Sequence, residues 1–418
     1  MVHEAGPTIG RRSILGAAIP AAALLFAGGV VRARPARARS GGADPSVPGR
    51  LRLPAPTGPH PVGTTTLYLV DRSRTDPWEP IAVREVMVTV YYPARGVAGR
   101  TLAPQLPAAA AREFAEAGPL SHPQLPSTGV DWAATRTHSH VDAPAQTTRR
   151  PVLLYSPGGG DPRGMGTALA EELAGRGYVV VAMDHPGDAA VVEFPVDLTG
   201  RDRVRWTVFR FDPRNDPTIA DTMIDTRIAD TKFVLDQVTV LAAGGNPDPT
   251  GRPLPADLHR VLDPRRVGVY GHSAGGTTAA ETMAEDHRIS AAINMEGYLD
   301  HPPRVPGRVG ELYPIARDGA DRPLLLIDTD GFPEHAVLER SWSALIAHSR
   351  HRVSRLRMRS AAHAVFTDYA AIAPRLVASG LMRPADRDTL IGAIAPTRSI
   401  PTVRRYVHGF FARHLPTH

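Results

Sequence analysis

The sequence predicts a doubly wound, mostly parallel α/β sheet with antiparallel strands on its N-terminal side and a cap insertion. Short, continuously apolar runs recur along the chain, as expected of parallel strands that helices cover on both faces. Helical segments lie between these runs, and this alternation is typical of a doubly wound sheet. Two earlier runs alternate apolar and polar residues, which indicates antiparallel strands with one solvated face.

The predicted elements follow one another in a regular order. The two alternating runs are residues 64–70 and 83–92. Residues 188–217 break the rhythm and are predicted to form a cap near the carboxyl ends of the strands, where binding sites in such sheets lie. The buried strands are predicted at residues 152–155, 178–182, 267–270, 289–293 and 324–327, and a last strand is predicted at residues 355–359. The helices are predicted at residues 165–173, 219–241, 277–285 and 336–347.

The first 38 residues have the composition of an export signal. Arg11 and Arg12 precede a mildly apolar stretch at residues 14–31, and the small-residue site Ala36-Arg37-Ala38 follows it. This pattern resembles a twin-arginine leader, so we expect a secreted protein, released or retained at the cell envelope. The alternative is an uncleaved membrane anchor, since the stretch is about long enough to span a bilayer.

Composition divides the remaining chain and excludes several classes of partner. Residues 39–58 are rich in Pro, Gly and Ser and indicate a flexible linker, which leaves residues 59–418 as one domain. The leader holds five of the 48 basic and one of the 42 acidic residues, so 43 and 41 remain, a net charge of +2. Lys232 is the one lysine, and this arginine bias indicates base composition rather than nucleic-acid binding. The absence of cysteine excludes disulfides and lipid-modified cysteines.

A glycine-flanked serine stands between a predicted strand and a predicted helix. The run Gly271-His272-Ser273-Ala274-Gly275-Gly276 has the layout of a nucleophile elbow, a turn so tight that only glycine fits on either side of the serine. The motif alone is weak, and the flanking elements support it. The alternative is a glycine-rich turn whose serine caps the helix.

A serine nucleophile needs an imidazole to take its proton and a carboxylate to hold that imidazole in one tautomer. In α/β-hydrolases these residues follow in the order serine, acid, histidine. His363, after the last predicted strand, is the best candidate base. His351 lies in an arginine-rich stretch predicted to be solvated, and His185 precedes the serine.

Three carboxylates compete for the role of the acid. Glu296 ends the strand after the nucleophile helix, and Asp328 and Asp330 end the next strand. Either strand end can reach an imidazole in the final loop, so spacing does not choose between them. An acidic residue at a strand end also often caps a helix.

Three blocks of the chain together resemble the platelet-activating-factor acetylhydrolase family, the calcium-independent serine lipases of the secreted type. They are residues 153–160, 271–276 and 360–368, and the similarity extends from about Leu53 to the C-terminus. The resemblance implies an α/β-hydrolase fold with an esterase or lipase activity. It also implies that Glu296 is the acid, with glutamate in place of the usual aspartate.

Two backbone N–H donors are needed to stabilise the oxyanion of an acyl-transfer reaction. Ala274 is expected to supply one, because it follows the nucleophile at the start of a helix. The resemblance assigns the other to Gly159, in the loop at residues 156–160, where Pro157 stands in place of the family's usual histidine.

Two further motifs are predicted to carry no cofactor or metal. The glycine loop lacks dinucleotide-binding spacing, because Asp161 and Pro162 interrupt it. The run His138-Ser139-His140-Val141-Asp142 resembles half of a metal-ligand set, but Ala143 stands where the next histidine is expected. We therefore expect a solvated loop there.

Together these features predict a secreted serine esterase that cleaves short acyl esters through Ser273. The family implies phospholipids with a short or oxidised acyl chain at the second glycerol position, and hence transient contact with a lipid surface. A broad carboxylesterase, a triacylglycerol lipase or a polyester hydrolase would use the same chemistry, and a non-catalytic binding protein could share the fold. No feature of the sequence predicts an oligomeric state.

Overall fold

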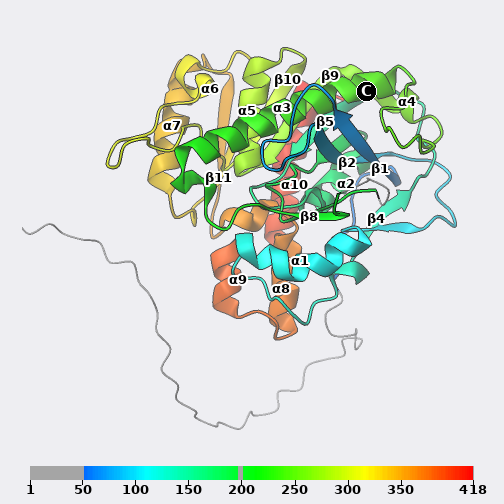
Figure 1. Ribbon diagram of the computed structural model, residues 1–418, viewed down its shortest axis with the longest axis horizontal. Coiled ribbons are helices and arrows are strands. Elements are labelled where there is room, and N and C mark those ends of the chain that lie inside the picture. Colours follow the sequence, from blue (N-terminus) through cyan, green and yellow to red (C-terminus); the bar gives the residue numbers. More distant parts are fainter. Residues whose placement is uncertain (1–50, 196–200, 418) are drawn as a thin grey trace, which may run out of the picture. The chain divides into compact units, whose positions relative to one another are not determined.

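The computed structural model describes residues 51–195 and 201–417, and in this part of the chain one large twisted sheet organises the structure (Figure 1). The strands of the sheet follow the order β12-β11-β10-β9-β5-β6-β2-β1-β4-β3, and β7 pairs with β8 in a separate hairpin. The strands are β1 Val62–Asp71, β2 Arg84–Pro93, β3 Leu102–Pro104, β4 Arg136–Val141, β5 Arg150–Ser156, β6 Val179–Met183, β7 Val191–Glu193, β8 Val204–Trp206, β9 Leu262–His272, β10 Ile289–Met295, β11 Leu324–Thr329 and β12 Val353–Met358.

The sheet from β6 to β12 is parallel, whereas β2 pairs antiparallel with β6 and with β1. The predicted α/β class, with a mostly parallel sheet and antiparallel strands on its N-terminal side, is confirmed. None of the helices in the described residues combines the length and the apolar content needed to cross a bilayer. The helices are α1 Ala108–Ser121, α2 Thr167–Gly175, α3 Pro217–Ala242, α4 Leu258–Val261, α5 Ala274–Glu285, α6 Pro314–Asp318, α7 His335–His348, α8 Tyr369–Ala378, α9 Pro384–Ile391 and α10 Pro396–His414. Short 3₁₀ turns are η1 Trp132–Ala134, η2 Arg163–Gly166, η3 Pro213–Asn215 and η4 His363–Phe366.

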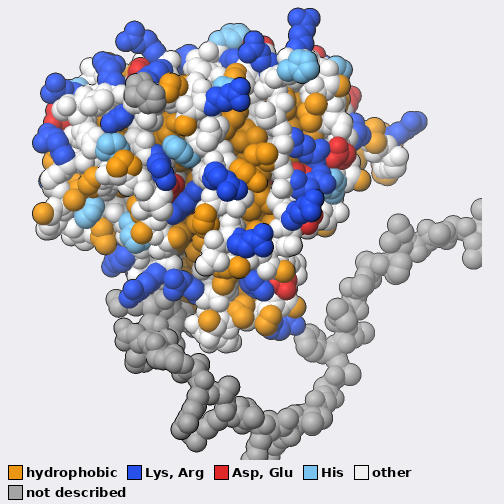
Figure 2. Space-filling view, turned by 180° about the vertical axis from the view of Figure 1, so that it is seen from behind, with side chains coloured by type: hydrophobic (Ala, Val, Ile, Leu, Met, Phe, Trp, Pro, Cys, Tyr) orange, Lys and Arg blue, Asp and Glu red, His pale blue; other side chains and the backbone are white. Residues whose placement is uncertain are grey.

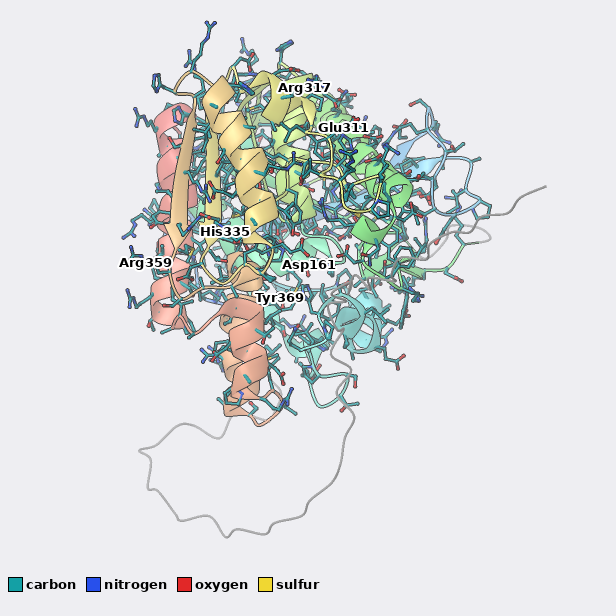
Figure 3. All side chains as sticks on the ribbon, turned by 90° about the vertical axis from the view of Figure 1, so that its left-hand side faces the viewer. Asp161, Glu311, Arg317, His335, Arg359 and Tyr369 are labelled. Carbon is teal, nitrogen blue, oxygen red and sulfur yellow. The ribbon has the colours of Figure 1, made fainter. Side chains whose placement is uncertain are left out.

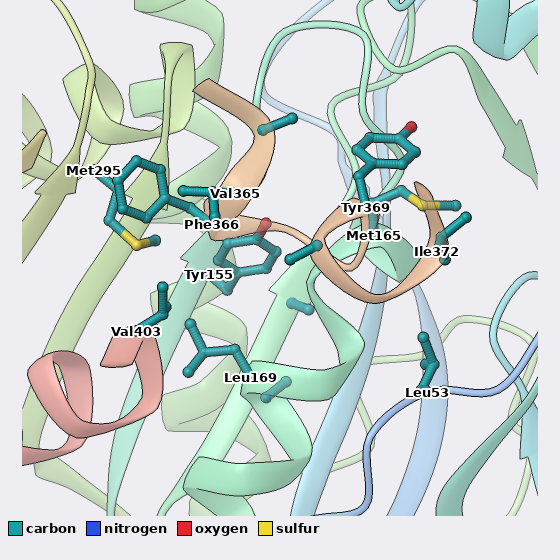
Figure 4. Packing of buried hydrophobic residues seen from close by; sticks show 14 of the residues in the cluster. Leu53, Tyr155, Met165, Leu169, Met295, Val365, Phe366, Tyr369, Ile372 and Val403 are labelled. Atoms are coloured by element: carbon teal, nitrogen blue, oxygen red, sulfur yellow. The ribbon is translucent and has the colours of Figure 1, made fainter. Parts of the chain in front are cut away.

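Two hydrophobic layers enclose the sheet. Figure 1 shows α3 and α5 in front of the strands and α10 behind them. Side chains of α3, α5 and α7 pack with the strands on one face, and side chains of α2, α8 and α10 pack on the other. Figure 4 shows part of the second layer, where Tyr155 of β5 lies among Leu169, Phe366 and Val403. Burial on both faces explains why the parallel strands are continuously apolar.

The first two strands are also buried on both faces, so the predicted solvated face is wrong. Tyr91 of β2 belongs to the layer formed with α2, while its neighbours Val90 and Tyr92 belong to the layer formed with α3. The polar positions that suggested solvent exposure are partly threonines, such as Thr64 and Thr65, which are themselves buried. Helices that are distant in the sequence therefore cover a face of these strands that the alternation of apolar and polar residues predicted to be solvated.

Residues 51–58, predicted as part of a flexible linker, pack against the domain. The side chains of Leu51 and Leu53 are buried. Thr57 N–H donates to Glu172 Oε2 over 2.7 Å, and the guanidinium of Arg404 donates to the carbonyls of residues 54 and 55. The packed domain thus begins ahead of the predicted boundary at residue 59. The predicted export signal and residues 39–50 lie outside the described residues.

The histidine run at residues 138–142 is not the solvated loop that we predicted. Most of it forms β4, whose burial alternates along the strand. His138 N–H donates to Glu171 Oε1 over 2.7 Å, and the Ser139 hydroxyl donates to the same oxygen. Alternate side chains of this run therefore face the interior, as in any half-buried strand.

The segment predicted as a cap, residues 188–217, contains the β7–β8 hairpin and η3, with residues 196–200 outside the description. Glu193 at the end of β7 anchors this hairpin, because its Oε2 accepts the N–H groups of Ala109 and Ala110 over 2.8 and 2.9 Å. These N–H groups belong to the first turn of α1, where backbone donors lack intrahelical partners.

On the opposite view of the molecule, Figure 2 shows arginine side chains dispersed among hydrophobic ones rather than gathered in one patch.

Candidate active site

Ser273 lies at the sharp turn from β9 into α5. Its backbone has φ 55° and ψ −124°, a strained conformation for a residue with a side chain, which costs about 1–3 kcal/mol. A Cβ atom at Gly271 would lie 2.0 Å from the carbonyl oxygen of Gly275, and one at Gly275 would lie 2.0 Å from that of Ser156. Only glycine fits at these two positions, as the nucleophile-elbow interpretation requires.

His363 and Glu296 meet across the sheet edge. His363 opens η4 after β12, and its Nδ1 donates to Glu296 Oε2 over 2.7 Å. The other carboxylate oxygen of Glu296 accepts the N–H and the hydroxyl of Thr329 over 2.6 and 2.7 Å. Glu296 is fully buried and, like Ser273, has a positive φ, 61°. This arrangement fixes the proton of His363 on Nδ1 and leaves Nε2 as an acceptor.

The two aspartates that competed with Glu296 have other partners. Asp328 accepts hydrogen bonds from Arg355 and Arg357 over 2.7 and 2.9 Å. Burial alone would raise the pKa of Asp328, but these guanidinium groups hold it below its usual value. Asp330 accepts the N–H groups of residues 360 and 361, in the loop that leads to His363. Of the three carboxylates, the structure therefore brings Glu296 to the imidazole.

His272, which the sequence analysis did not single out, packs directly on His363. The two ring centroids lie 4.4 Å apart, and His272 Nε2 donates to the carbonyl oxygen of His363 over 2.9 Å. Burial lowers the pKa of the His272 imidazole well below its usual value, so this ring is neutral. Phe332 contacts the His363 ring as well, with centroids 4.9 Å apart. The two neighbouring rings restrict the orientation of His363.

The two predicted oxyanion donors are neighbours in space. A Cβ atom at Gly159 would lie 3.9 Å from the Cβ of Ala274. Within the described residues, the N–H groups of Gly159 and Ala274 have no hydrogen-bond acceptor. The next N–H group, that of Gly160, instead donates to Asp188 Oδ1 over 2.9 Å.

A cavity of about 410 Å³ joins these groups. Ser273 and His363 both line it, as do Gly159 and Ala274. The predicted cap contributes one wall, and apolar side chains of α3 and Tyr313 contribute another, so the cavity has an apolar side next to Ala274. The other lining residues are Leu120, Ser121, His122, Gly158, Gly160, Asp161, Asp188, Thr207, Phe209, Phe211, Asp212, Pro213, Arg214, Ala220, Met223, Ile224, His272, Thr277, Tyr298 and Pro302.

A second histidine–carboxylate pair lines the same cavity and was not predicted. His122 Nε2 lies 2.9 Å from Asp161 Oδ1, and the Tyr369 hydroxyl donates to the same oxygen over 3.2 Å. Figure 3 shows Asp161 and Tyr369 close together, well away from Arg317 and Glu311. Asp161 appeared in the sequence only as an interruption of the glycine loop. Its role as the acceptor that orders His122 and Tyr369 depends on segments far apart in the chain.

The remaining predicted candidates lie elsewhere. His351 is exposed, in the turn before β12, as its arginine-rich surroundings indicate. His185 is buried beneath the glycine loop, where its ring bonds Ser156 and Asp230. Burial lowers the pKa of His185 to about 4, so it too is a neutral ring.

Comparison with known proteins identifies relatives over most of the chain. Residues 46–400 match the family model described as platelet-activating factor acetylhydrolase, isoform II. A probable 1-alkyl-2-acetylglycerophosphocholine esterase from Arthroderma benhamiae is 27% identical over 380 residues, which cover 88% of this chain and 89% of the relative. The platelet-activating factor acetylhydrolase of Gallus gallus is 21% identical over 292 residues, 63% of this chain and 62% of that protein.

A solved structure is similar over the same extent. The ferulic acid esterase from Streptomyces cinnamoneus superposes with a TM-score of 0.67 and 34% sequence identity, covering 88% of this chain and 94% of that one. The fold, the family model and the esterase relatives agree with the resemblance that the sequence motifs carry. The chain belongs to the platelet-activating factor acetylhydrolase isoform II family, and it is an ester hydrolase.

Proposed function

We propose that this protein cleaves short acyl esters through a covalent acyl-enzyme on Ser273. The observation that carries the proposal is the 2.7 Å hydrogen bond from His363 to the buried Glu296, at the edge of a cavity that also contains Ser273. A histidine held in one tautomer by a buried carboxylate is the base that a serine nucleophile requires.

The first half of the reaction forms the acyl-enzyme. His363 Nε2 takes the proton of the Ser273 hydroxyl as its oxygen attacks the ester carbonyl carbon. The carbonyl oxygen becomes an oxyanion that the N–H groups of Gly159 and Ala274 stabilise. The imidazolium of His363 then gives its proton to the departing alcohol oxygen, and the carbon–oxygen bond of the ester breaks.

The second half reverses the roles with water. His363 accepts a proton from a water molecule, whose oxygen attacks the acyl carbon and forms a second oxyanion in the same site. The proton returns to Ser273 as its bond to the acyl carbon breaks, and the carboxylic acid leaves. Glu296 keeps its charge throughout and stabilises the imidazolium in each half.

The proposed substrate is a phospholipid with a short or oxidised acyl chain at the second glycerol position, which the protein would meet at a lipid surface. Support comes from the family and from the esterase named for a 2-acetyl glycerophosphocholine. The apolar side of the cavity, with Phe209, Met223 and Ile224, suits an acyl group next to Ala274.

A second candidate substrate is an aromatic acid ester. The similar solved structure is named a ferulic acid esterase. Four aromatic side chains line the cavity here, Phe209, Phe211, Tyr298 and Tyr313, and aromatic rings stack favourably on one another. Both substrates would use the same nucleophile, so the choice rests on the fit of the acyl group.

An acyl-chain series separates these substrates. We expect kcat/KM to be highest for a phospholipid with an sn-2 acetyl group and to fall for chains beyond about eight carbons, because each methylene that does not fit costs binding. Methyl ferulate serves as the comparison. Rates that climb with chain length would contradict the short-acyl proposal, and a clear preference for methyl ferulate would replace it with the second candidate.

We also propose that residues 1–38 export the protein, on the evidence of the Arg11-Arg12 pair and the cleavage-site pattern. Expressed with its leader in a host with a twin-arginine pathway, the protein is expected outside the cytoplasm, with an N-terminus after Ala38. Replacing both arginines by lysine should keep it inside. Export that is unchanged by this replacement would contradict the proposed route.

A further inference from the structure

Arg227 of α3 is a buried arginine that binds Asp188 and the loop beside the nucleophile. Its side chain is 1% exposed. The Nη1 group donates to the carbonyl oxygen of Pro157 over 2.7 Å, and Nη2 donates to that of Gly158 over 3.1 Å. Its Nε donates to Asp188, whose other oxygen accepts the N–H of Gly160. One guanidinium thus holds Pro157 and Gly158 directly and Gly160 through the carboxylate of Asp188.

These bonds, together with the N–H of Asp161, which also donates to the carbonyl oxygen of Gly158 over 3.1 Å, determine which way the next N–H group points. In a trans peptide the carbonyl and the following N–H lie on opposite sides of the chain. Because the carbonyl of Gly158 faces Arg227, the N–H of Gly159 in the same peptide faces away from Arg227. Gly159 borders the cavity beside Ala274, so this direction is toward the place of the ester carbonyl.

The loop needs such a restraint because of its composition. Gly158, Gly159 and Gly160 have no side chains to pack, and glycine adopts many backbone conformations. Rotation of the peptide between Gly158 and Gly159 would turn a carbonyl oxygen toward the developing oxyanion. The planar fork of an arginine can bind two carbonyls and a carboxylate together, which a lysine ammonium cannot do with the same geometry.

A hydrogen bond between the side chains of Ser156 and His185 also fixes the start of the loop. Asp230 accepts from His185 Nδ1 at 3.1 Å, so His185 Nε2 is an acceptor for the Ser156 hydroxyl at 2.9 Å. The Ser156 oxygen in turn accepts a long contact, 3.4 Å, from Arg227 Nη1. The charge of Arg227 is balanced by Asp188, so its burial leaves no uncompensated ion.

We propose that Arg227, paired with Asp188, is a positioning residue that locks the peptide between Gly158 and Gly159 with its N–H directed at the oxyanion. The inference rests on the proposed function, because it assigns a partner to one donor of that site. Arg227 touches no substrate, and its effect is exerted through the loop.

The variant Arg227→Lys tests this positioning role. We expect kcat to fall about 10- to 100-fold with little change in KM, because a misdirected donor acts only on the transition state. The affinity for a short-chain trifluoromethyl ketone, which forms an oxyanion on the serine, should fall by the same factor. The affinity for the matching ether analogue, which forms no oxyanion, should not change.

Arg404→Lys is the matched control. Arg404 of α10 is also largely buried, donates to the carbonyls of Pro54, Ala55 and Ala168, and lies 3.2 Å from Glu172, but none of these residues lines the cavity. We expect Arg404→Lys to lower the melting temperature while kcat and ketone affinity stay at the wild-type values. A purely structural role for Arg227 predicts this same pattern for Arg227→Lys, and that result would overturn the proposal.

Asp188→Asn provides a second test if Arg227→Lys does not fold. An asparagine oxygen can still accept the Gly160 N–H, but it holds the guanidinium less strongly. We expect a smaller loss, equal for kcat and for ketone affinity, and no loss in either would overturn the proposal. A wild-type protein without esterase activity would instead refute the proposed function. An active wild type with unaffected variants would refute only the positioning role of Arg227.

Discussion

Replacing Ser273 by alanine is expected to reduce kcat by about 10⁴- to 10⁶-fold, since the covalent route is lost and only binding and the oxyanion donors remain. The measurement is steady-state hydrolysis of p-nitrophenyl acetate by the purified variant. The alanine should not destabilise the fold, because the backbone strain at φ 55° belongs to the turn and Ser273 lines the cavity.

Ser399→Ala is a suitable control for this experiment. Ser399 is a fully buried serine on α10, it lies outside the cavity, and its hydroxyl has no hydrogen-bond partner within the described residues. We expect its kcat to equal that of the wild type. A Ser273→Ala protein that keeps a substantial part of the activity would show that another group is the nucleophile.

Replacing Glu296 by glutamine is expected to lower kcat by about 10³- to 10⁴-fold. The amide can present a donor to His363 Nδ1 instead of an acceptor, so the imidazole is no longer held with its proton on Nδ1. It also carries no charge to stabilise the imidazolium. The two bonds from Thr329 can persist on the amide oxygen, so the variant should fold. The kcat for p-nitrophenyl acetate, measured beside the unfolding transition, separates the two effects.

Asp328→Asn and Asp330→Asn are the matched charge-neutral controls for Glu296→Gln. Asp328→Asn weakens the bonds to Arg355 and Arg357 and should lower stability more than activity. Asp330→Asn alters an acceptor in the loop before His363 and should have a small effect on kcat. If one of the aspartate variants loses most of the activity while Glu296→Gln keeps it, Glu296 is not the supporting acid.

Chain order and local pattern were enough to predict the parallel strands and the positions of Ser273 and His363. Chain order and local pattern were not enough to choose the carboxylate that supports His363. Strands β10 and β11 are adjacent and parallel, so Glu296 and Asp328 emerge at the same edge of the sheet. Two donors from Thr329 bind Glu296, and two arginines of β12 bind Asp328. Sequence spacing contains no information on these contacts.

The features that were predicted wrongly, or not predicted, all depend on contacts between segments that are far apart in the sequence. The buried second face of β1 and β2 depends on α2 and α3. Arg227 is separated by about seventy residues from the carbonyls that it binds. The sequence held no signal for this role, because polar residues such as Asp225, Thr226 and Asp230 stand near Arg227 in the predicted helix. For His272, the signal was its place between glycine and the serine of the elbow.

In the proposed reaction Ser273, activated by His363 and Glu296, carries the acyl group. Reaction with a fluorophosphonate probe, followed by mass spectrometry of the peptides, tests it most directly. We expect one phosphonyl adduct per chain on Ser273, no adduct in Ser273→Ala, and much slower labelling of Glu296→Gln. A wild-type protein that hydrolyses esters and yet stays unlabelled, or that carries the adduct on another residue, would contradict the claim.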